Sequence, residues 1–544
     1  MATAVPTDAP LSVREALGDP DAYPLLRDLV RFATTNLEDP VRQRWEKPHY
    51  VEAARYLLEV AARWGLEARI FDPLTDLPGV EGLHGIPRPN VIVDLDVGAA
   101  ERVIILSHYD VVPVPTEQLA RWRTPPHVLT FRSDGLFYGR GAADDLGSGV
   151  VPSLLALKQL RDHRTLARNV RLLICCDEET GGAGGIECLK AHDEQLPVND
   201  PARFLLADVV LIPDGDPHAT AGSSGVLFLD GTFARPVPLP RVLAFGEGLI
   251  GLQTLAESWV SVYRSPDWPD HDAPAPYITG RATVTKWEVA AAQGAASGRP
   301  LVRAIHAETD ATNQVAQSVT ILFEGSAAQL QALPGQLSPL LSPPFRLERG
   351  GATSLEVLPG ALALSVVGQS AHAGYPHRGH NPVPAAVALL DRALRAGWLD
   401  GSSGLNATFG VDVRLIPEMA MEAGVQAALG YAQTWSAVHD PEARVEAPPD
   451  RGRGGYALPP DHPALLKMER ILGSVFGAKG VFGEYGGTDA SSLLGMRTPR
   501  GEPLPALVFG LMGRASHIHE AEENLDPAGV ARVTETIRRY VLEP

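Results

Sequence analysis

The chain has 544 residues, with 47 Lys and Arg against 65 Asp and Glu and a formal net charge of -18. This length exceeds what one hydrophobic core usually organises, so two or more domains are expected. The negative charge argues against nucleic acid as a partner, because phosphates favour basic surfaces, and it attracts cations or simply aids solubility.

The cysteine content and the N-terminal sequence bear on the compartment. The three cysteines are too few for a disulfide framework, which favours a reducing compartment. The first ten residues lack a basic region followed by an apolar stretch, and no run of the ~18 apolar residues that a membrane span needs occurs anywhere. We therefore expect a cytoplasmic protein with no membrane partner.

The first part of the chain alternates helix-like and strand-like segments. Apolar residues at helical spacing predict helices over Tyr50–Trp64 and Ser148–Leu160. Short apolar runs predict strands over Asn90–Val97, Val103–Ser107, Val170–Cys176 and Val209–Ile212. This alternation predicts an α/β fold, a mainly parallel sheet with helices on both faces.

From about residue 231 to residue 444 the pattern changes to that of an α+β domain. The strands predicted there are Ser318–Phe323, Ala361–Val367 and Ala407–Leu415, with one helix over Val383–Leu394. The first pattern then returns with a helix near His462–Phe476, a strand over Ala506–Leu511 and a final helix over Pro527–Val541. We expect a discontinuous domain of residues 1–230 and 445–544 around an inserted domain of residues 231–444.

Residues that can bind metal follow the predicted strands of the first domain. They are His108 and Asp110, Glu178 and Glu179, Asp214, and a late loop with His517 and His519, joined by Asp144 and Asp145 just before a helix. In open parallel sheets the ligand crevice lies outside the carboxyl ends of the strands, so these side chains are expected at one edge. Each group alone is more often a helix cap or a solvated loop.

Taken together, these residues predict a metal site. Gathered carboxylates repel one another unless cations neutralise them, and imidazole with carboxylate ligation suits zinc, manganese or cobalt. Two assignments have competitors, because Asp216 lies near Asp214 and His517 near His519. We prefer Asp214 because it directly follows the strand.

At these residues the sequence resembles the di-metal peptidases of clan MH. This family includes carnosinases, the dipeptidase PepV, aminoacylase, carboxypeptidase G and succinyl-diaminopimelate desuccinylase. The segments that carry the resemblance run in order along the chain: 108–113, 139–145, 177–181, 213–214, 368–374, 379–382, 486–490 and the loop around His519. The chain length, the long insertion and Asn313–Ala316 most resemble the PepV and carnosinase branch.

The resemblance implies two divalent metal ions, with zinc expected first and manganese or cobalt as alternatives. Asp144 would bridge the two ions, His108 and Asp214 would complete the ligands of one, and Glu179 and His519 those of the other. His519 is preferred over His517 because the family loop places an acidic residue four positions after the histidine, where Glu523 stands.

The resemblance also implies a phosphorylase/hydrolase-like catalytic domain, an inserted lid that binds substrate or mediates dimers, and a mechanism. Glu178 would be the general base toward a hydroxide that bridges the two ions, and Asp110 would orient His108. His372 would stabilise the oxyanion and contact substrate, together with Asn381 and Thr488. The expected reaction is hydrolysis of amide or peptide bonds in small substrates, dipeptides first, by a monomer or homodimer.

Three departures from the family pattern leave the substrate open. Leu146 stands where relatives often have Lys, Ser491 where many dipeptidases have a carboxylate-binding Arg, and Ala316 where Pro is expected. An alternative is therefore a deacylase of N-acyl amino acids or another small-amide hydrolase. A more distant one is a non-catalytic binding protein on the same fold. A serine hydrolase is disfavoured because no G-x-S-x-G elbow follows a strand.

Overall fold

The computed structural model describes residues 10–544 apart from 36–37, 40–43, 46–47, 78, 80–82, 115, 164–165, 266–276, 293–297, 309–314, 342–352, 370, 372, 375, 377–378, 449–451 and 479. The chain divides into two compact units. Unit 1 consists of Met1–Ala221, Leu458–Phe482 and Thr488–Pro544, and unit 2 of Gly222–Ala457 and Gly483–Gly487. Unit 1 is therefore built from both ends of the chain.

The sheet of unit 1 has four parallel strands at its centre, in the order β24, β9, β5, β8. Their bounds are β5 (Glu101–His108), β8 (Arg168–Cys175), β9 (Val209–Ile212) and β24 (Ala506–Val508). β5 and β8 are buried along almost their whole length, as their continuous apolar runs predict for strands covered on both faces.

Antiparallel strands extend this sheet at both edges. β4 (Asn90–Leu95) and β3 (Glu67–Phe71) follow β8, and β10 (Ala219–Ser223) follows β24. The sequence predicts the parallel centre but not these edges. Only residues 96–100 join β4 to β5, whereas a parallel connection needs a crossover of a dozen or more residues. This short connection explains why β4 runs antiparallel to the central strands. The predicted strand 506–511 also ends early, at Val508.

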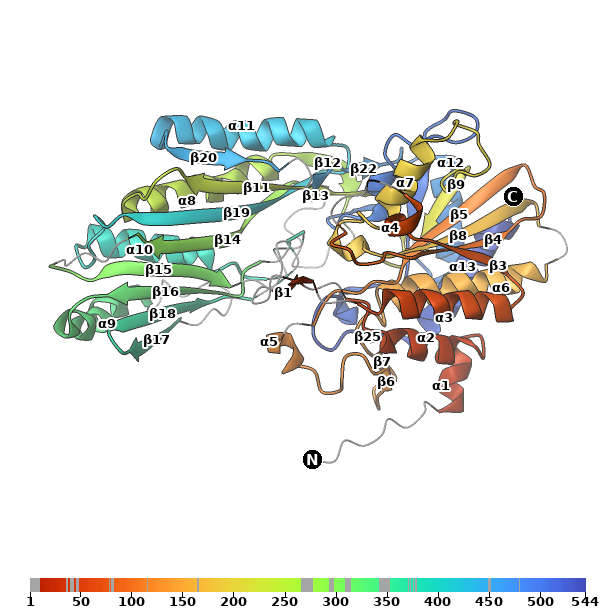
Figure 1. Ribbon diagram of the computed structural model, residues 1–544, viewed down its shortest axis with the longest axis horizontal. Coiled ribbons are helices and arrows are strands. Elements are labelled where there is room, and N and C mark those ends of the chain that lie inside the picture. Colours follow the sequence, from red (N-terminus) through yellow and green to blue (C-terminus); the bar gives the residue numbers. More distant parts are fainter. Residues whose placement is uncertain are drawn as a thin grey trace. The chain divides into compact units, whose positions relative to one another are not determined.

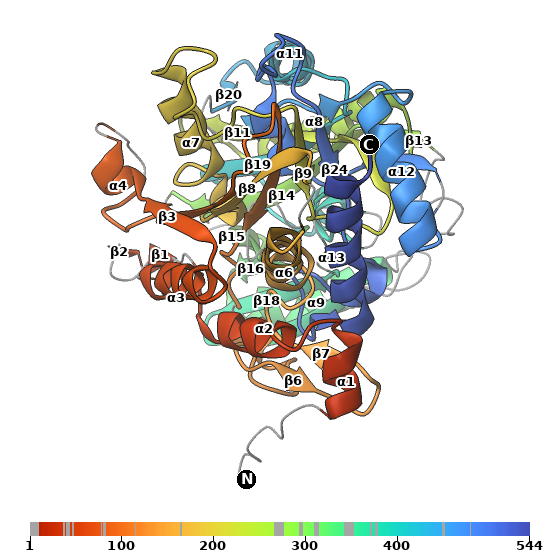
Figure 2. The same ribbon diagram turned by 90° about the vertical axis from the view of Figure 1, so that its right-hand side faces the viewer.

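Helices cover both faces of this sheet, as predicted. Figure 2 shows α3, α6 and α13 along one face and α7 on the other. α6 follows directly from η1 (Asp145–Val150), a π-helical turn. The helices of unit 1 are α1 (Leu11–Ala16), α2 (Ala22–Arg31), α3 (Tyr50–Arg63), α4 (Pro73–Asp76), α5 (Thr116–Leu119), α6 (Val151–Arg161), α7 (Ile186–Glu194), α12 (Pro463–Val475) and α13 (Pro527–Leu542).

Short elements complete unit 1. The 3-10 turns are η2 (Glu178–Thr180), η4 (Asp489–Leu493) and η5 (Arg514–Ser516). The strands outside the main sheet are β1 (Glu38–Asp39) paired with β2 (Arg44–Trp45), and β25 (Asn524–Leu525), β7 (Phe137–Tyr138) and β6 (Thr130–Phe131) in a second small sheet.

Unit 2 is an antiparallel sheet in the order β17-β18-β16-β15-β14-β19-β11-β20 (Figure 1). The strands are β11 (Gly225–Phe233), β14 (Arg281–Ala291), β15 (Leu301–Glu308), β16 (Ser318–Glu324), β17 (Thr353–Leu358), β18 (Ala361–Val367), β19 (Leu405–Leu415) and β20 (Ala443–Glu446). The helices are α8 (Leu239–Glu257), α9 (Ala327–Leu341), α10 (Val383–Arg395) and α11 (Met421–His439). This is the α+β arrangement that the sequence predicts for the insertion.

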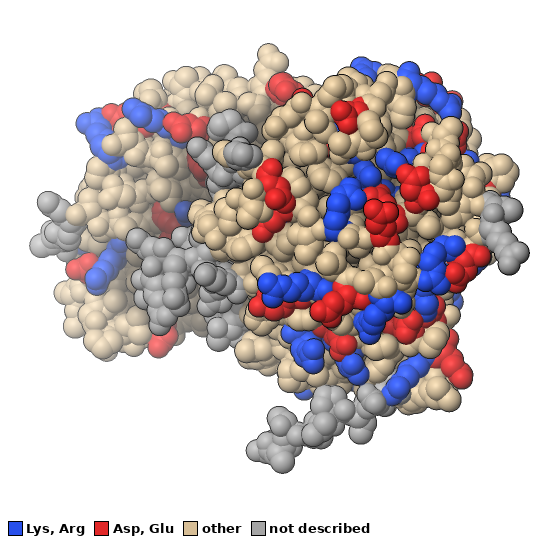
Figure 3. Space-filling model, turned by 45° about the vertical axis from the view of Figure 1, so that its right-hand side comes forward, with Lys and Arg blue, Asp and Glu red and all other residues tan. Residues whose placement is uncertain are grey.

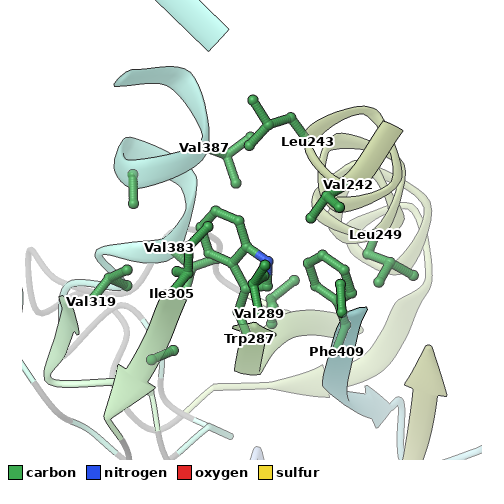
Figure 4. Close-up of a cluster of buried hydrophobic side chains, with 14 of the residues drawn as sticks. Val242, Leu243, Leu249, Trp287, Val289, Ile305, Val319, Val383, Val387 and Phe409 are labelled. Carbon is green, nitrogen blue, oxygen red and sulfur yellow. The ribbon is translucent and has the colours of Figure 1, made fainter. Parts of the chain in front are cut away.

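The helices of unit 2 pack on the sheet through one hydrophobic core. β16 alternates, with Val319, Ile321 and Phe323 buried toward this core. At its centre the ring of Trp287 stacks on that of Phe409, with ring centroids 5.9 Å apart (Figure 4). Unit 2 thus has a core of its own.

The charged side chains on the face drawn in Figure 3 are of mixed sign, with acidic and basic groups interspersed. The coloured Lys and Arg side chains of that face form no continuous basic surface of the kind that binds nucleic acid. Among the described helices, none is both long and apolar enough to cross a bilayer.

Candidate metal centre

The parallel strands of unit 1 bring chemically active residues to one edge of the sheet. β5 ends on His108, which lies opposite Cys175 at the end of β8. The turn η2 with Glu178 and Glu179 follows β8, and Asp214 follows β9. Because β5, β8 and β9 run in the same direction, their carboxyl ends share an edge, as the sequence predicts.

Asp144, Glu179 and His519 come together although they are distant in sequence. Nε2 of His519 lies 2.8 Å from Oδ2 of Asp144 and 3.1 Å from Oε1 of Glu179. One potential ligand atom from each of the three residues lies within 4.8 Å of the other two. Two carboxylates and one imidazole at this spacing could hold a single divalent ion.

His108 lies in a second group of acidic residues in the same unit. Its Nε2 is 3.5 Å from Oδ1 of Asp145 and 3.7 Å from Oδ2 of Asp214, and its Nδ1 is 3.3 Å from Oδ1 of Asp110. Asp110 therefore lies at the ring nitrogen that faces away from Asp145 and Asp214. A carboxylate in that position fixes the ring and leaves Nε2 free to bind a metal.

The charges in these two groups shift one another's pKa values. Burial would lower the pKa of His108, but Asp145, Asp110 and Asp214 outweigh it and raise that pKa well above its usual value. For His519 burial is likewise outweighed, here by Glu179 and Asp144, and the pKa is raised. Burial and the neighbouring Asp144 raise the pKa of Asp145.

These residues fit a divalent cation. Oδ1 of Asp145 and Oε1 of Glu179 are buried, and the described residues donate no well-aimed hydrogen bond to either atom. Each is paired instead with a histidine ring, at His108 and His519, and a bound cation would satisfy these oxygens once the rings bind it in their neutral form. Imidazole and carboxylate donors suit zinc, manganese or cobalt.

Asp110 also holds the turn that carries Glu178 and Glu179. Its Oδ1 accepts a hydrogen bond from the Glu178 backbone N–H at 3.1 Å, and its Oδ2 accepts one from Glu179 at 3.0 Å. Asp177, just before them, has a left-handed backbone with φ of 76°. One carboxylate thus positions both the end of β5 and the turn after β8.

A second buried carboxylate, Glu523, holds the loop that carries Asp144. It accepts hydrogen bonds from the backbone N–H groups of Gly141 at 3.0 Å and Ala143 at 3.0 Å and from Nη1 of Arg140 at 2.8 Å. Arg140 also donates to Gln118, whose Nε2 donates to the main-chain oxygen of His519 at 2.9 Å. The loops of Asp144 and His519 are therefore joined by one network.

The two ambiguous positions separate clearly in space. His519 contacts Asp144 and Glu179, whereas His517 is half exposed and lies 3.5 Å from Glu520. Asp214 lies at His108, whereas the main-chain oxygen of Asp216 accepts from Gly510 and His218. His519 and Asp214 thus lie beside other candidate ligands, and their roles as metal ligands stay predictions.

The expected substrate contacts are placed differently. His372 lies outside the described residues. The Asn381 amide donates to the oxygen of Val284 at 2.9 Å and accepts from the N–H of Val383 at 3.0 Å, both within unit 2. Thr488 is buried and caps η4 by accepting from the N–H of Ala490. Both described side chains thus hydrogen-bond to backbone groups.

Asp145 is the residue that sequence reasoning left without a role. It is buried and its carboxylate is closer to His108 than that of Asp214 is. The adjacent pair Asp144–Asp145 is visible in the sequence, but spacing alone cannot say where each side chain points in an irregular π-helical turn.

The family model "Peptidase family M20/M25/M40" matches residues 104–543, and the chain belongs to this family of metallopeptidases. This confirms the family that the sequence motifs indicate. The match covers both segments of unit 1 that carry the candidate centre, together with unit 2.

Curated relatives match over parts of their length. An uncharacterized metallohydrolase of Methanocaldococcus jannaschii is 28% identical over 214 residues, 38% of this chain and 48% of the relative. A cysteinylglycine-S-conjugate dipeptidase of Corynebacterium striatum is 30% identical over 164 residues, 30% of this chain and 31% of the relative. The matched segments thus span less than half of these relatives.

Solved structures match over almost the whole chain and show the fold. Human carnosine dipeptidase 1 has a TM-score of 0.55 at 14% identity and covers 98% of each chain. A di-peptidase of Saccharomyces cerevisiae has a TM-score of 0.53 at 15% identity and covers 97% of each chain.

Proposed function

We propose that the protein hydrolyses amide or peptide bonds in small substrates, dipeptides first, with two divalent metal ions. The observation that carries this proposal is the cluster of Asp144, Glu179 and His519 beside the acidic neighbourhood of His108. Both groups set buried carboxylates against a histidine ring, and these are the donor types that divalent cations such as zinc bind.

In this proposal Asp144 is shared by the two ions. Glu179 and His519 complete the ligands of one, and His108 and Asp214 those of the other, with Asp145 beside His108. Zinc is the first choice because histidine and carboxylate ligands suit it, with manganese or cobalt as alternatives. Such ions supply a water molecule of lowered pKa and polarise the substrate carbonyl.

The chain's own residues supply proton transfer and positioning. Glu178 accepts the proton of the attacking water and returns it to the leaving nitrogen, which is a general-base and then a general-acid role. Asp110 holds His108 and the turn of Glu178 in place. His372 is proposed to stabilise the oxyanion, and Asn381 and Thr488, whose side chains are held by backbone groups, are proposed to contact substrate.

A second candidate keeps the chemistry and changes the substrate to an N-acyl amino acid or another small amide. Two observations favour a small amide without a free carboxylate, a group that N-acyl amino acids share with dipeptides. The buried Ser491 supplies no charge for a substrate carboxylate. Arg414 is already paired with Asp412, with Nε 2.7 Å from Oδ1 and Nη2 2.8 Å from Oδ2. A substrate without a free carboxylate would need neither residue.

The test is amine release from dipeptides, amidated dipeptides and N-acyl amino acids. It is run before and after chelation and with zinc, manganese or cobalt restored. We expect hydrolysis that disappears on chelation and returns with metal, and the preferred substrate separates the two candidates. A folded protein that hydrolyses none of these substrates with any metal contradicts both. The family relationship and the reducing compartment also lead us to propose a cytoplasmic location.

A further inference from the structure

Behind the turn η2 lies a buried arginine that no step of the proposed reaction uses. Arg88 is 1% exposed, and its Nε lies 3.1 Å from Oδ1 of Asp177, which is 3% exposed. The same guanidinium group donates to the oxygen of Ile86 at 3.2 Å and lies over the ring of Tyr50. An ion pair this deeply buried has no solvent to replace either partner.

Asp177 is the residue that sets the direction of the turn. Its left-handed backbone immediately precedes Glu178, and such a backbone is unfavourable for a residue with a side chain unless its surroundings hold it. Its carboxylate is held on three sides, by Arg88, by the hydroxyl of Thr180 and by the N–H of Gly184 at 2.9 Å. Arg88 supplies the only positive charge among these three contacts.

The far end of the same turn fits closely around Arg88. A Cβ atom added to Gly184 would lie 2.3 Å from Cγ of Arg88, so the backbone at 184 passes directly over this side chain. Asn90, two residues after Arg88, donates to the oxygen of Gly184 at 2.9 Å and accepts from the N–H of Cys176. The segment 88–90 therefore holds both the start and the end of the turn that carries Glu178.

We propose that Arg88 is a positioning residue: through Asp177 it fixes the turn that aims Glu178 and Glu179 at the candidate metal centre. This inference takes the role of Glu178 from the proposed function. Its structural content, the order of the turn, can be tested in the metal-free protein without any substrate.

The experiment is hydrogen exchange of the peptides covering residues 176–184 in the metal-free full-length protein. Arg88→Met removes the charge, and Gly184→Ala displaces Arg88 while every charge remains. The matched control is Arg171→Met, since Arg171 is also buried and pairs with Asp94 at 2.6 Å. That pair joins β4 to β8 away from the turn, so it controls for general loss of stability. Arg88→Lys tests whether a positive charge at this position is enough to keep the turn protected from exchange.

We expect the amides of this turn to exchange about tenfold faster in Arg88→Met and Gly184→Ala, because the turn opens more readily when the contact that orders it is lost. Amides in the middle of β5 serve as the internal reference in each sample, and Arg171→Met should leave the turn unchanged relative to them. Arg88→Lys should restore part of the protection. Unchanged exchange at the turn in both Arg88→Met and Gly184→Ala, or an equal change in Arg171→Met, overturns the inference.

Activity assays of the same variants separate the two proposals. If the wild type hydrolyses the substrate panel, we expect kcat of Arg88→Met at saturating metal to fall about tenfold with little change in KM. The reason is that the change displaces the general base and leaves the substrate contacts in place. If the wild type hydrolyses nothing, the proposed function fails while the exchange data still decide the role of Arg88.

Discussion

The carboxylate of Glu523 accepts a hydrogen bond from the backbone N–H of Asp144 at 3.3 Å, across 379 positions of the sequence. Burial raises the pKa of Glu523, and the neighbouring Arg140 opposes that rise. The loops that carry Asp144 and His519 therefore depend on one buried acceptor.

Glu523→Gln should weaken both the fold and the candidate metal centre. The change leaves Arg140 buried without its ion pair, and breaking such a pair lowers the free energy of unfolding by about 3 kcal/mol. Metal affinity should fall about tenfold, because the Asp144 loop loses its support. Urea unfolding and metal titration against a chelating dye measure the two effects.

The neighbouring Glu522→Gln is the control for Glu523→Gln. Glu522 pairs with Arg132 at a more exposed position, so its loss should lower the free energy of unfolding by less than about 1 kcal/mol. Equal losses from the two variants would show that the buried network around Glu523 has no special role.

Glu178→Gln should abolish most of the hydrolysis without removing the metal. The amide cannot accept the proton of the attacking water, so kcat is expected to fall by about 10² to 10⁴. Metal content, measured by mass spectrometry, should stay at the wild-type level because Glu178 is not one of the proposed ligands. Glu187→Gln, at the start of α7, is the control. Turnover close to wild type in Glu178→Gln would exclude this residue as the base.

Metal affinity should rise with pH. In the metal-free protein neighbouring carboxylates raise the pKa of His108 and of His519, so both rings hold their protons more tightly than a free histidine does. A metal ion binds only the neutral imidazole and must displace these protons. The association constant is thus expected to increase about tenfold per pH unit for each proton displaced.

Titrations at pH 6, 7 and 8 against a chelator of known pH dependence check this.

The same raised pKa values predict how the stability of the metal-free protein changes with pH. The imidazolium–carboxylate contacts stabilise it fully below the ordinary histidine value, and this stabilisation is lost as pH rises through the raised values. Affinity that does not vary with pH would mean that the two rings are neutral before the metal binds.

Trp287→Ala should destabilise unit 2. The side chain is fully buried against Phe409, and truncating a buried Trp lowers the free energy of unfolding by about 3–5 kcal/mol. Lys286→Ala, at an exposed position of the same strand, should change it by less than about 0.5 kcal/mol. Hydrogen exchange of β14 and β19 measures this loss of stability. Similar exchange in Trp287→Ala and Lys286→Ala would contradict the prediction.

Much of the framework is predictable from the sequence because local chemistry determines it. The continuous apolar runs of β5, β8 and β9 identify buried parallel strands, and the polar residues that follow them identify the edge with the candidate centre. α8 and α11 are harder to predict. α8 is apolar around most of its circumference and contains Gly246, Gly248 and Gly251, so no clean helical period appears.

Contacts between distant parts of the chain are what the sequence does not reveal. The hydrogen bonds from Glu523 to the Asp144 loop, and the ion pair between Arg88 and Asp177, join segments that share no pattern. The position of Asp145 at His108 depends on a π-helical turn, whose side-chain directions do not follow helical spacing. The backbone of Asp177 is likewise set by its surroundings and not by its residue type.

The parallel pairing of β9 with β24 has a consequence for synthesis of the protein. The chain leaves the ribosome with its N-terminal end first, so β5, β8 and β9 emerge long before β24 and α13. Nearly all of unit 2 is made in between. Unit 2 can form its own core while unit 1 still lacks a central strand and its last helix. His519 follows nearly all of unit 2 in the chain, so the cluster with Asp144 and Glu179 can form only after that unit has been made. A nascent chain therefore cannot assemble this cluster while unit 2 is still being synthesised.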